Sequence, residues 1–249
     1  MSGEDQTDIE ISISEIYDQL QHVPMPTPKK EKKPEEFNEL HDEVNENRIR
    51  KVCTETSGDI DYKRLLFFKM HPVAAGLKAF KNDSVIYVDT PLMRAAILAK
   101  IQEENEKSLI EKPRGGFDSD KPAKRITLKI PEIICVAEHP KADEFAKKYN
   151  VSKSMAGFMI LKDDIQKSVV VIGKDDAALL SVCRMAERGS LPYLVLGFPA
   201  GINTQMTSKE YLADIQIELP LMTMSQTKGG VETAAACLVE LMKIYEEGV

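Results

Sequence analysis

The sequence predicts an α/β fold of three layers, in which helices cover both faces of a doubly wound, mainly parallel β-sheet. One observation behind this prediction is that five short apolar runs are each followed by a stretch of helical periodicity, and repeated strand–helix units build parallel sheets. The other is that the runs are almost continuously apolar instead of alternating, as expected for strands covered on both faces. The runs comprise residues 84–90, 132–138, 168–173, 193–198 and 221–226.

Each predicted strand has its own helix, and the pairs follow one another along the chain. The run SVIYVDT is followed by helical PLMRAAILAKIQEENEK, and EIICVAE is followed by PKADEFAKKYN. The run SVVVIG precedes DDAALLSVCRMAERG, in which Asp175 or Asp176 is placed to cap the helix. YLVLGF precedes SKEYLADI, and LMTMSQ precedes GGVETAAACLVELMKIYEE. Every strand therefore leads into a helix, which is the connection that neighbouring parallel strands require.

Two further helical stretches and a connector precede the first strand. Apolar side chains at helical spacing predict one helix from about residue 9 to 20 and another from about 35 to 52. Between them, residues 24–36 hold four prolines among lysines and glutamates, a composition typical of a solvated connector. We therefore expect a helix with its connector at residues 1–36 and an α/β domain at residues 37–249.

A basic insertion separates the first sheet helix from the second strand. Residues 108–129 carry six lysines and arginines against three acidic residues, in a chain whose net charge is −7. The proline, glycine and charge content of this segment predicts a mobile loop. The loop is either solvated and basic without further consequence, or a lid that attracts an anionic ligand, and the sequence leaves both open.

Composition excludes several classes of protein. The negative net charge argues against a general nucleic-acid binder, and no apolar run reaches the roughly 18 residues that span a bilayer. The polar, acidic amino terminus does not resemble a signal peptide. The four cysteines form no C-x-x-C pair, so reduced, buried thiols are expected instead of disulfides or a metal site. These features predict a cytoplasmic protein with no membrane and no nucleic-acid partner.

Loops after the predicted strands carry groups that bind anions. Lys228, Gly229 and Gly230 separate the last strand from the last helix, and bare amides at a helix N-terminus beside an ammonium suit a carboxylate. Lys174 follows the third strand, and Asn203 follows the fourth. Ligands of such sheets bind beyond the carboxyl ends of the strands, at a topological switch point. Together the loops therefore predict a ligand with several negative groups.

Several motifs occur in the order found in one enzyme family. They are GDIDYKRLLFF with HPVAAGLKAF, VIYVDTPLMRAAI, IICVAEHPKADEFAKK, VVVIGKDDAALL, LVLGFPAGINTQMTSKEYL and TKGGVETAAACLVELM. In these segments, which span about residues 57–245, the chain resembles the precorrin-8X methylmutase (cobalt-precorrin isomerase) family of cobalamin biosynthesis. The GFPAG and SKE elements, followed by KGG and AAA, are the most specific part of the resemblance.

The resemblance implies a flavodoxin-like fold, a homodimer and an isomerase that uses no cofactor. The family reaction is an intramolecular methyl migration on ring C of a precorrin, which gives hydrogenobyrinic or cobyrinic acid. The implied partner is an anionic tetrapyrrole, a precorrin or corrinoid, whose many carboxylates fit the predicted anion-binding loops. The residues expected to bind it are Thr90, Arg94, Lys174, Asn203, Lys228, Gly229 and Gly230.

The chain departs from the family at the catalytic position. Family enzymes assist the migration with a histidine in an H-A-T-G or H-A-C-G segment, whereas Glu55 stands three residues before Gly58 here. A glutamic acid donates a proton near neutral pH only where its surroundings raise the pKa well above about 4.3. Glu55 is therefore expected either to replace the histidine as the acid or to be an exposed structural residue. His71 and His139, each before a proline, are rival candidates for the acid, with a local role in a loop as the alternative.

Three functions consequently remain open. The first is a precorrin-8X methylmutase-like isomerase that binds its substrate at the carboxyl edge of the sheet. The second, motivated by the missing histidine, is a non-catalytic carrier of corrinoids. The third is an isomerase or lyase that acts on an unrelated anionic metabolite.

Overall fold

The computed structural model describes residues 39–110, 125–201 and 204–248. Residues 38–249 form one compact unit, and residues 1–37 belong to a separate unit that lies outside the described residues. The predicted amino-terminal helix, the proline-rich connector, most of the basic insertion and Asn203 therefore fall outside the part of the chain that is described.

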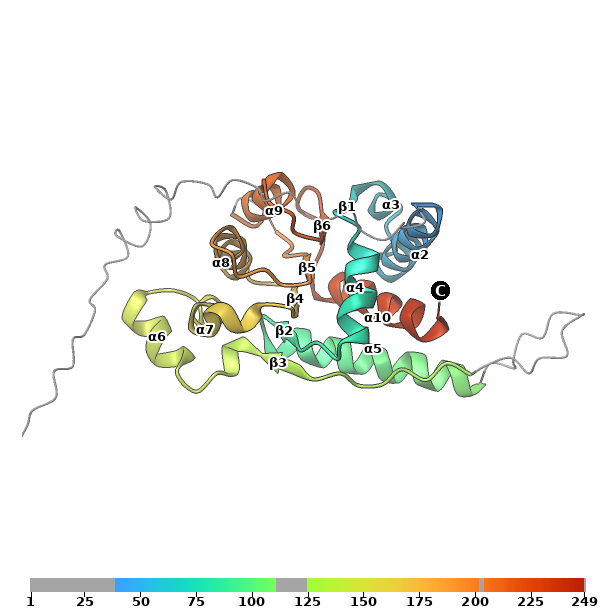
Figure 1. Cartoon of the computed structure of the whole chain (residues 1–249), viewed down its shortest axis with the longest axis horizontal. Coiled ribbons are helices and arrows are strands. Elements are labelled where there is room, and N and C mark those ends of the chain that lie inside the picture. Colours follow the sequence, from blue (N-terminus) through green and yellow to red (C-terminus); the bar gives the residue numbers. More distant parts are fainter. Residues whose placement is uncertain (1–38, 111–124, 202–203, 249) are drawn as a thin grey trace, which may run out of the picture. The chain divides into compact units, whose positions relative to one another are not determined.

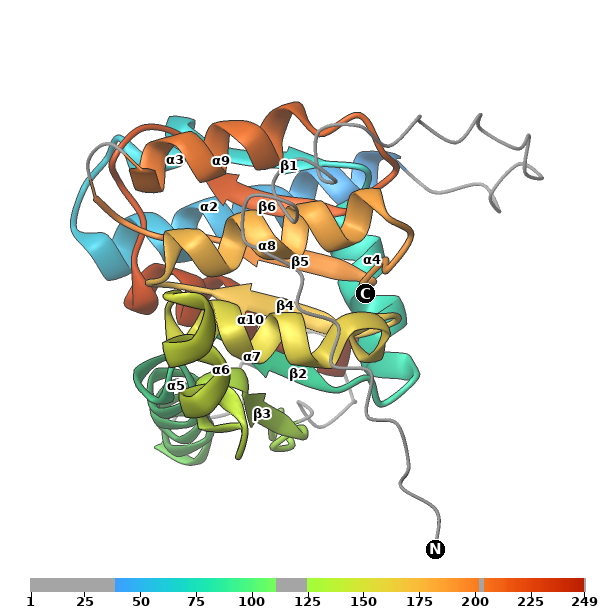
Figure 2. The ribbon, with the colours of Figure 1, turned by 90° about the vertical axis from the view of Figure 1, so that its left-hand side faces the viewer.

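Within the described residues, six strands form one sheet in the order β1–β6–β5–β4–β2–β3 (Figure 2). The strands are β1 (Leu66–Lys69), β2 (Ile86–Val88), β3 (Ile133–Cys135), β4 (Val169–Ile172), β5 (Leu194–Gly197) and β6 (Leu221–Met224). All neighbours are parallel except β1 and β6. The five parallel strands are the five predicted ones, and their order is that of a doubly wound, flavodoxin-like sheet.

The antiparallel strand β1 is absent from the sequence prediction. Its four residues follow directly on the short helix α3 (Tyr62–Leu65), so the local pattern is too short to separate a strand from a helix. The extended state comes from the tertiary structure, because Leu66 lies opposite Met224 and Lys69 lies opposite Leu221. β1 thus runs from the carboxyl edge of the parallel strands to their amino edge.

Helices cover both faces of the sheet, as predicted (Figure 1). On one side lie α2 (Glu39–Ser57), α4 (Pro72–Lys81), α5 (Pro91–Ile110) and α10 (Val231–Glu247). On the other lie α7 (Lys153–Leu161), α8 (Asp176–Glu187) and α9 (Thr204–Asp214), with α6 (Ala142–Tyr149) against α7. Two short 3₁₀ helices, η1 (Val136–Glu138) and η2 (Lys162–Ile165), complete the second side. In the described part of the chain, no helix is both long and apolar enough to cross a membrane.

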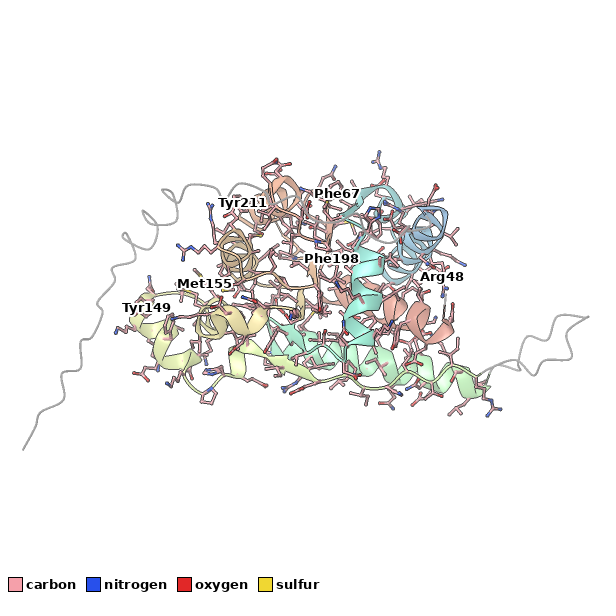
Figure 3. All side chains as sticks on the ribbon, viewed as in Figure 1. Arg48, Phe67, Tyr149, Met155, Phe198 and Tyr211 are labelled. Atoms are coloured by element: carbon pink, nitrogen blue, oxygen red, sulfur yellow. The ribbon has the colours of Figure 1, made fainter. Side chains whose placement is uncertain are left out.

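The burial of the central strands explains their continuous apolar runs. Successive side chains of a strand point to opposite faces of the sheet. Val169 and Val171 of β4 accordingly join the core beneath α5 and α10, whereas Val170 and Ile172 join the core beneath α7 and α8. Phe198, which follows β5, is also fully buried and lies inside the molecule (Figure 3). A strand with apolar contacts on both faces has no position at which a polar residue would be favoured.

Polar contacts fix the helices that frame the carboxyl edge. The Asp175 carboxylate accepts a hydrogen bond from the Ala178 amide at 3.0 Å and so caps α8, as the sequence predicts for one of the two aspartates. On the other side of the sheet, Arg48 of α2 binds Glu240 of α10 at 2.8 Å and lies at the outside of this layer (Figure 3).

The strands β2 and β4 are neighbours, yet they lead into α5 and α8 on opposite faces. The switch point of the sheet lies between them.

Candidate functional site

Asp89 joins two loops at the switch point. It follows β2, is completely buried, and its Oδ2 accepts hydrogen bonds from the amides of Lys174 at 2.8 Å and Asp175 at 2.9 Å. Burial raises the pKa of this carboxyl, and the hydrogen bonds from these amides oppose that shift. Asp89 therefore ties the loop after β2 to the loop after β4, which is a structural use of its carboxylate.

Thr90 and Lys174 lie in these two loops, and their side chains differ in how free they are to bind a ligand. The Thr90 hydroxyl donates to Asp89 at 3.2 Å and accepts from the Met93 amide at 3.2 Å, which starts α5. Its polar contacts are thus made within the protein. The Lys174 side chain is exposed and makes no ion pair with the part of the chain that is described. Of the two, Lys174 has the freer group for a ligand.

Gly173 allows the start of α10 to approach the same place. A Cβ at this position would lie 2.7 Å from Met93 Sδ and 2.9 Å from Val231 Cα, both closer than such atoms pack. Only a glycine therefore lets the loops after β2, β4 and β6 come together. The structure thus brings Thr90, Lys174 and the beginning of α10 to one edge of the sheet, as predicted.

Lys228 is held by acidic residues from the turn between α2 and α3. Its ammonium contacts the Asp59 carboxylate and lies 3.1 Å from Asp61 Oδ2. The hydrogen bond between Lys228 and Asp59 raises the pKa of the lysine and lowers that of the aspartate. Two carboxylates around one ammonium give a local charge of −1, so a ligand carboxylate at Lys228 has to compete with them. Sequence reasoning did not foresee this pairing.

The amides of Gly229 and Gly230 have partners within the protein. The Gly230 amide donates to the Phe198 carbonyl at 2.6 Å, so the prediction of bare amides is wrong for this residue. The Gly229 amide lies 3.3 Å from the Tyr62 hydroxyl, near the upper limit for a hydrogen bond. The first N–H groups of α10 follow directly, and a helix leaves these without partners of its own. The backbone donors of this turn that are weakly bound, or that have no partner within the helix, are therefore those of Gly229 and the first turn of α10.

Lys209 is a buried charged residue that the sequence prediction missed. Only 2% of it is exposed, and its ammonium donates to the Lys228 carbonyl at 2.6 Å. Burial lowers its pKa to about 8, against the opposing effect of Asp176. The sequence around the SKE element carries no local signal for this burial, because Ser208, Lys209 and Leu212 become buried only when α9 packs against the rest of the protein.

Glu55 lies in a different place from the residues above. Its side chain is 64% exposed and lies 3.8 Å from Lys51 Nζ. It lines a hollow of about 290 Å³ between α2, α5 and α10, together with Lys100, Lys107 and Lys243. Within the described part of the chain, the surroundings of Glu55 therefore do not provide the burial that a proton-donating glutamic acid needs.

Arg94 makes a bidentate ion pair on the outer side of β3. Its guanidinium nitrogens lie 2.6 and 3.1 Å from the carboxylate oxygens of Glu138. Both residues line a hollow of about 310 Å³ beside the edge strand, together with His139. The structure thus does not bring Arg94 to Lys228, and the charge of Arg94 is already matched within the protein.

The two rival histidines lie at opposite edges of the sheet. His71 follows β1, whose end lies at the amino edge, and its Nδ1 lies 2.9 Å from Asp42 Oδ2. It is the N-cap residue of α4, as its position before Pro72 predicts. His139 follows β3 and η1 at the carboxyl edge, where its Nδ1 accepts from the Lys141 amide at 3.2 Å. Of the two, His139 alone is on the edge that carries the predicted site.

Comparisons with known proteins agree with this architecture. The model of the precorrin-8X methylmutase family matches residues 32–114 and 121–244, and the gap falls within the basic insertion. The cobalt-precorrin-8 methylmutase of Methanocaldococcus jannaschii is 28% identical over 204 residues, which cover 82% of this chain and 79% of that protein. The protein of the same name from Priestia megaterium is 25% identical over 194 residues, 78% of this chain and 75% of that one.

Solved structures are similar to this fold at lower sequence identity. The precorrin-8x methyl mutase of Thermus thermophilus superimposes with a TM-score of 0.64 at 21% identity, over 86% of this chain and 91% of that one. A precorrin-8X methylmutase related protein superimposes with a TM-score of 0.62 at 21% identity, over 80% of this chain and 92% of that one. The sheet and its helix layers are therefore those of these structures.

Proposed function

This chain belongs to the precorrin-8X methylmutase family of cobalamin-biosynthesis isomerases, and from that premise we propose that it binds an anionic precorrin at the carboxyl edge of its sheet. The proposed reaction is the migration of a methyl group between adjacent carbons of ring C, which yields hydrogenobyrinic or cobyrinic acid. The methyl group moves within one molecule, so the reaction consumes no second substrate and no reductant. We further propose that the active form is a homodimer.

The observation that carries this proposal is the meeting of three loops at the switch point. Asp89 holds the loops after β2 and β4 together, and Gly173 admits the start of α10 beside them. A helix N-terminus favours a negative charge, and the exposed ammonium of Lys174 lies at the same edge. A substrate fringed with carboxylates is the kind of ligand that these groups attract.

The predicted substrate-binding residues differ in how freely they can contact the substrate. Lys174, the Gly229 amide and the first turn of α10 are the primary contacts, because their donors are exposed or weakly bound. Lys228 shares its ammonium with Asp59 and Asp61, so a substrate carboxylate at this lysine would displace one of them. Arg94 serves only a ligand that extends to the outer side of β3. Asn203 lies outside the described residues and stays a prediction.

Glu55 is proposed as the acid on the condition that it becomes covered. Glu55 lines the hollow between α2, α5 and α10, so the substrate would have to extend from the carboxyl edge into this hollow, or the second subunit would have to cover it, to exclude water from the exposed carboxyl. That exposure favours a second candidate function, a carrier that binds corrinoids without converting them.

A turnover assay distinguishes the two functions. The purified protein is incubated with the precorrin substrate, and the absorption bands of the product corrin are followed. If Glu55 is the acid, the wild type converts the substrate, Glu55→Ala abolishes conversion while retaining affinity, and Glu55→His restores or increases the rate. Glu43→Ala is the matched control, because Glu43 is an exposed glutamate of the same helix, and it is expected to leave the rate unchanged.

Other outcomes of this assay contradict either the isomerase proposal or the role of Glu55 in it. Binding without conversion, in the wild type and in Glu55→His, supports the carrier. Conversion by Glu55→Ala at the wild-type rate removes Glu55 from the mechanism while leaving the isomerase in place. If no corrinoid binds and an unrelated anion protects the protein against thermal unfolding, an isomerase or lyase that acts on an unrelated anionic metabolite is supported.

A further inference from the structure

The buried ammonium of Lys209 supports the turn at which the last strand meets the last helix. It lies on α9, and its nitrogen donates to the Lys228 carbonyl at 2.6 Å. An ammonium has three donors, and this is the one hydrogen bond that it makes with the described residues. Asp176, at the start of α8, is the acidic group close enough to act on its charge. The Asp176 carboxylate itself accepts a hydrogen bond from the Ser208 hydroxyl.

The geometry of the peptide bond links Lys209 to the side of this turn that faces Tyr62. The peptide between Lys228 and Gly229 is trans, so its carbonyl and its N–H point in opposite directions. Lys209 holds the carbonyl from the side of α9. The N–H of Gly229 is therefore aimed away from α9, at the side where the Tyr62 hydroxyl lies 3.3 Å away.

Two hydrogen bonds orient this turn, the one from Lys209 to the Lys228 carbonyl and one from the Gly230 amide. The Gly230 amide is bound to the Phe198 carbonyl at 2.6 Å. Gly229 has a φ of +138°, a conformation that favours glycine. Without Lys209, the carbonyl of Lys228 would have no donor on the side of α9 among the groups described, and the peptide could turn.

We propose that Lys209 is a positioning residue for substrate carboxylates: its ammonium, by holding the Lys228 carbonyl, keeps the Gly229 N–H turned toward the side of Tyr62, where a ligand carboxylate takes the place of the Tyr62 hydroxyl as its acceptor. Its positive charge, buried behind the turn, adds to the attraction for an anion. This inference rests on the proposed function, because it assigns a role within the same binding site. Lys209 itself does not touch the substrate.

A purely structural role explains the burial of Lys209 less well. A neutral amide side chain can also donate to a carbonyl, and it does so without placing a charge inside the protein. A buried ammonium weakens the folded state because it loses its hydration, and this burial lowers the pKa of Lys209 to about 8. A positive charge at this position is therefore expected to serve the site at the cost of some stability.

The proposal predicts a pH dependence that can be assigned to Lys209. The titratable groups on the elements packed against α9 are Asp176, Cys183, Arg184 and Glu187 of α8, Lys69 of β1, and Lys228 of the loop after β6. The pKa of Cys183 is raised to about 12, and that of Lys228 is raised by its contact with Asp59. Burial raises the pKa of Asp176 from 3.8, so Asp176 is the group that must be separated from Lys209.

The test is a titration with hydrogenobyrinic acid between pH 6.5 and about 9.5, with Kd measured from the corrin absorption bands. The wild type is expected to bind with constant affinity below about pH 7 and to lose up to about tenfold in affinity per pH unit above 8. Lys209→Met is expected to bind at least about tenfold more weakly at pH 7, with no dependence on pH. In Asp176→Asn the decline is expected to persist but to begin at lower pH, because Asp176 raises the pKa of Lys209.

Each alternative outcome has a definite meaning. A wild type that binds with the same affinity across this range overturns the role of Lys209 and leaves the proposed function intact. So does a Lys209→Met variant that keeps the wild-type profile. A wild type that binds at no pH overturns the proposed function and this inference together. If Lys209→Met does not fold, the pH profiles of the wild type and Asp176→Asn decide between the two residues. A decline in affinity that disappears in Asp176→Asn belongs to Asp176 and overturns the role of Lys209. A decline that persists and begins at lower pH supports Lys209.

Discussion

A Gly229→Ala variant is expected to be less stable than the wild type by about 2–4 kcal/mol and to bind hydrogenobyrinic acid at least about tenfold more weakly. The added Cβ would lie 2.5 Å from the Phe198 carbonyl oxygen and 3.2 Å from its carbon, and these are backbone atoms that cannot rotate away. The φ of +138° adds conformational strain for any residue with a side chain. The turn must therefore shift, and the Gly229 amide moves with it.

Gly189→Ala is the matched control for this experiment. Gly189 also has a positive φ, of +101°, but a Cβ at this position meets nothing within 4 Å. The control therefore carries the conformational strain without the collision, and a loss of about 1–2 kcal/mol with unchanged ligand affinity is expected. Urea unfolding and corrin titration of both variants measure the difference. Equal losses of stability in the two variants, or an unchanged affinity in Gly229→Ala, would show that the contact with Phe198 does not shape the site.

The second large effect is a change with pH in the stability difference between wild type and Lys209→Met. The pKa of Lys209 falls from 10.5 to about 8 on folding, so between these values the unfolded chain binds more protons than the folded protein. The wild type therefore gains stability as the pH rises through this interval. Relative to Lys209→Met, which has no such group, the wild type is expected to gain roughly 2–3 kcal/mol between pH 7 and 10.

Comparison with the variant isolates Lys209 from other groups that titrate in alkali. The pKa of Cys183 and that of Tyr211 are both raised to about 12 by burial, so these two residues destabilise the folded protein at high pH. Their contributions are common to both proteins and cancel in the difference. Urea unfolding at about pH 7, 8.5 and 10 measures it. A difference that stays constant over this interval would mean that the Lys209 ammonium is not buried in solution.

The sheet could be predicted from the sequence because its physical signal is local. Strands such as β4 and β5 are apolar at every position, and each leads directly into an amphipathic helix. Two of the elements that escaped prediction did so for identifiable reasons. The extended state of β1 depends on a partner far along the chain. Helix α7 contains Gly157, a residue of low helix propensity. A Cβ added at Gly157 would lie only 2.1 Å from the Val136 carbonyl oxygen, so the glycine is required by close packing that helix propensity does not encode.

The candidate site was predictable as a location but not as a set of contacts. That loops with Lys174 and Lys228 would share one edge follows from the parallel connectivity alone. That Lys228 would be paired with Asp59 depends on the turn between α2 and α3, which belongs to another part of the chain. The burial of Lys209 likewise arises only when α9 packs beneath the last loop. Sequence spacing locates groups on an edge, and tertiary packing decides which of them a ligand can use.

The most direct test of the proposed binding edge is a titration of the wild type with hydrogenobyrinic acid at neutral pH, alongside Lys174→Met and Lys81→Met. Both lysines are exposed, but Lys174 follows β4 at the carboxyl edge whereas Lys81 precedes β2 at the amino edge. We expect a saturable change in the corrin bands for the wild type and Lys81→Met, and weaker binding for Lys174→Met. No spectral change at high micromolar ligand, or equal affinity in all three proteins, would contradict it.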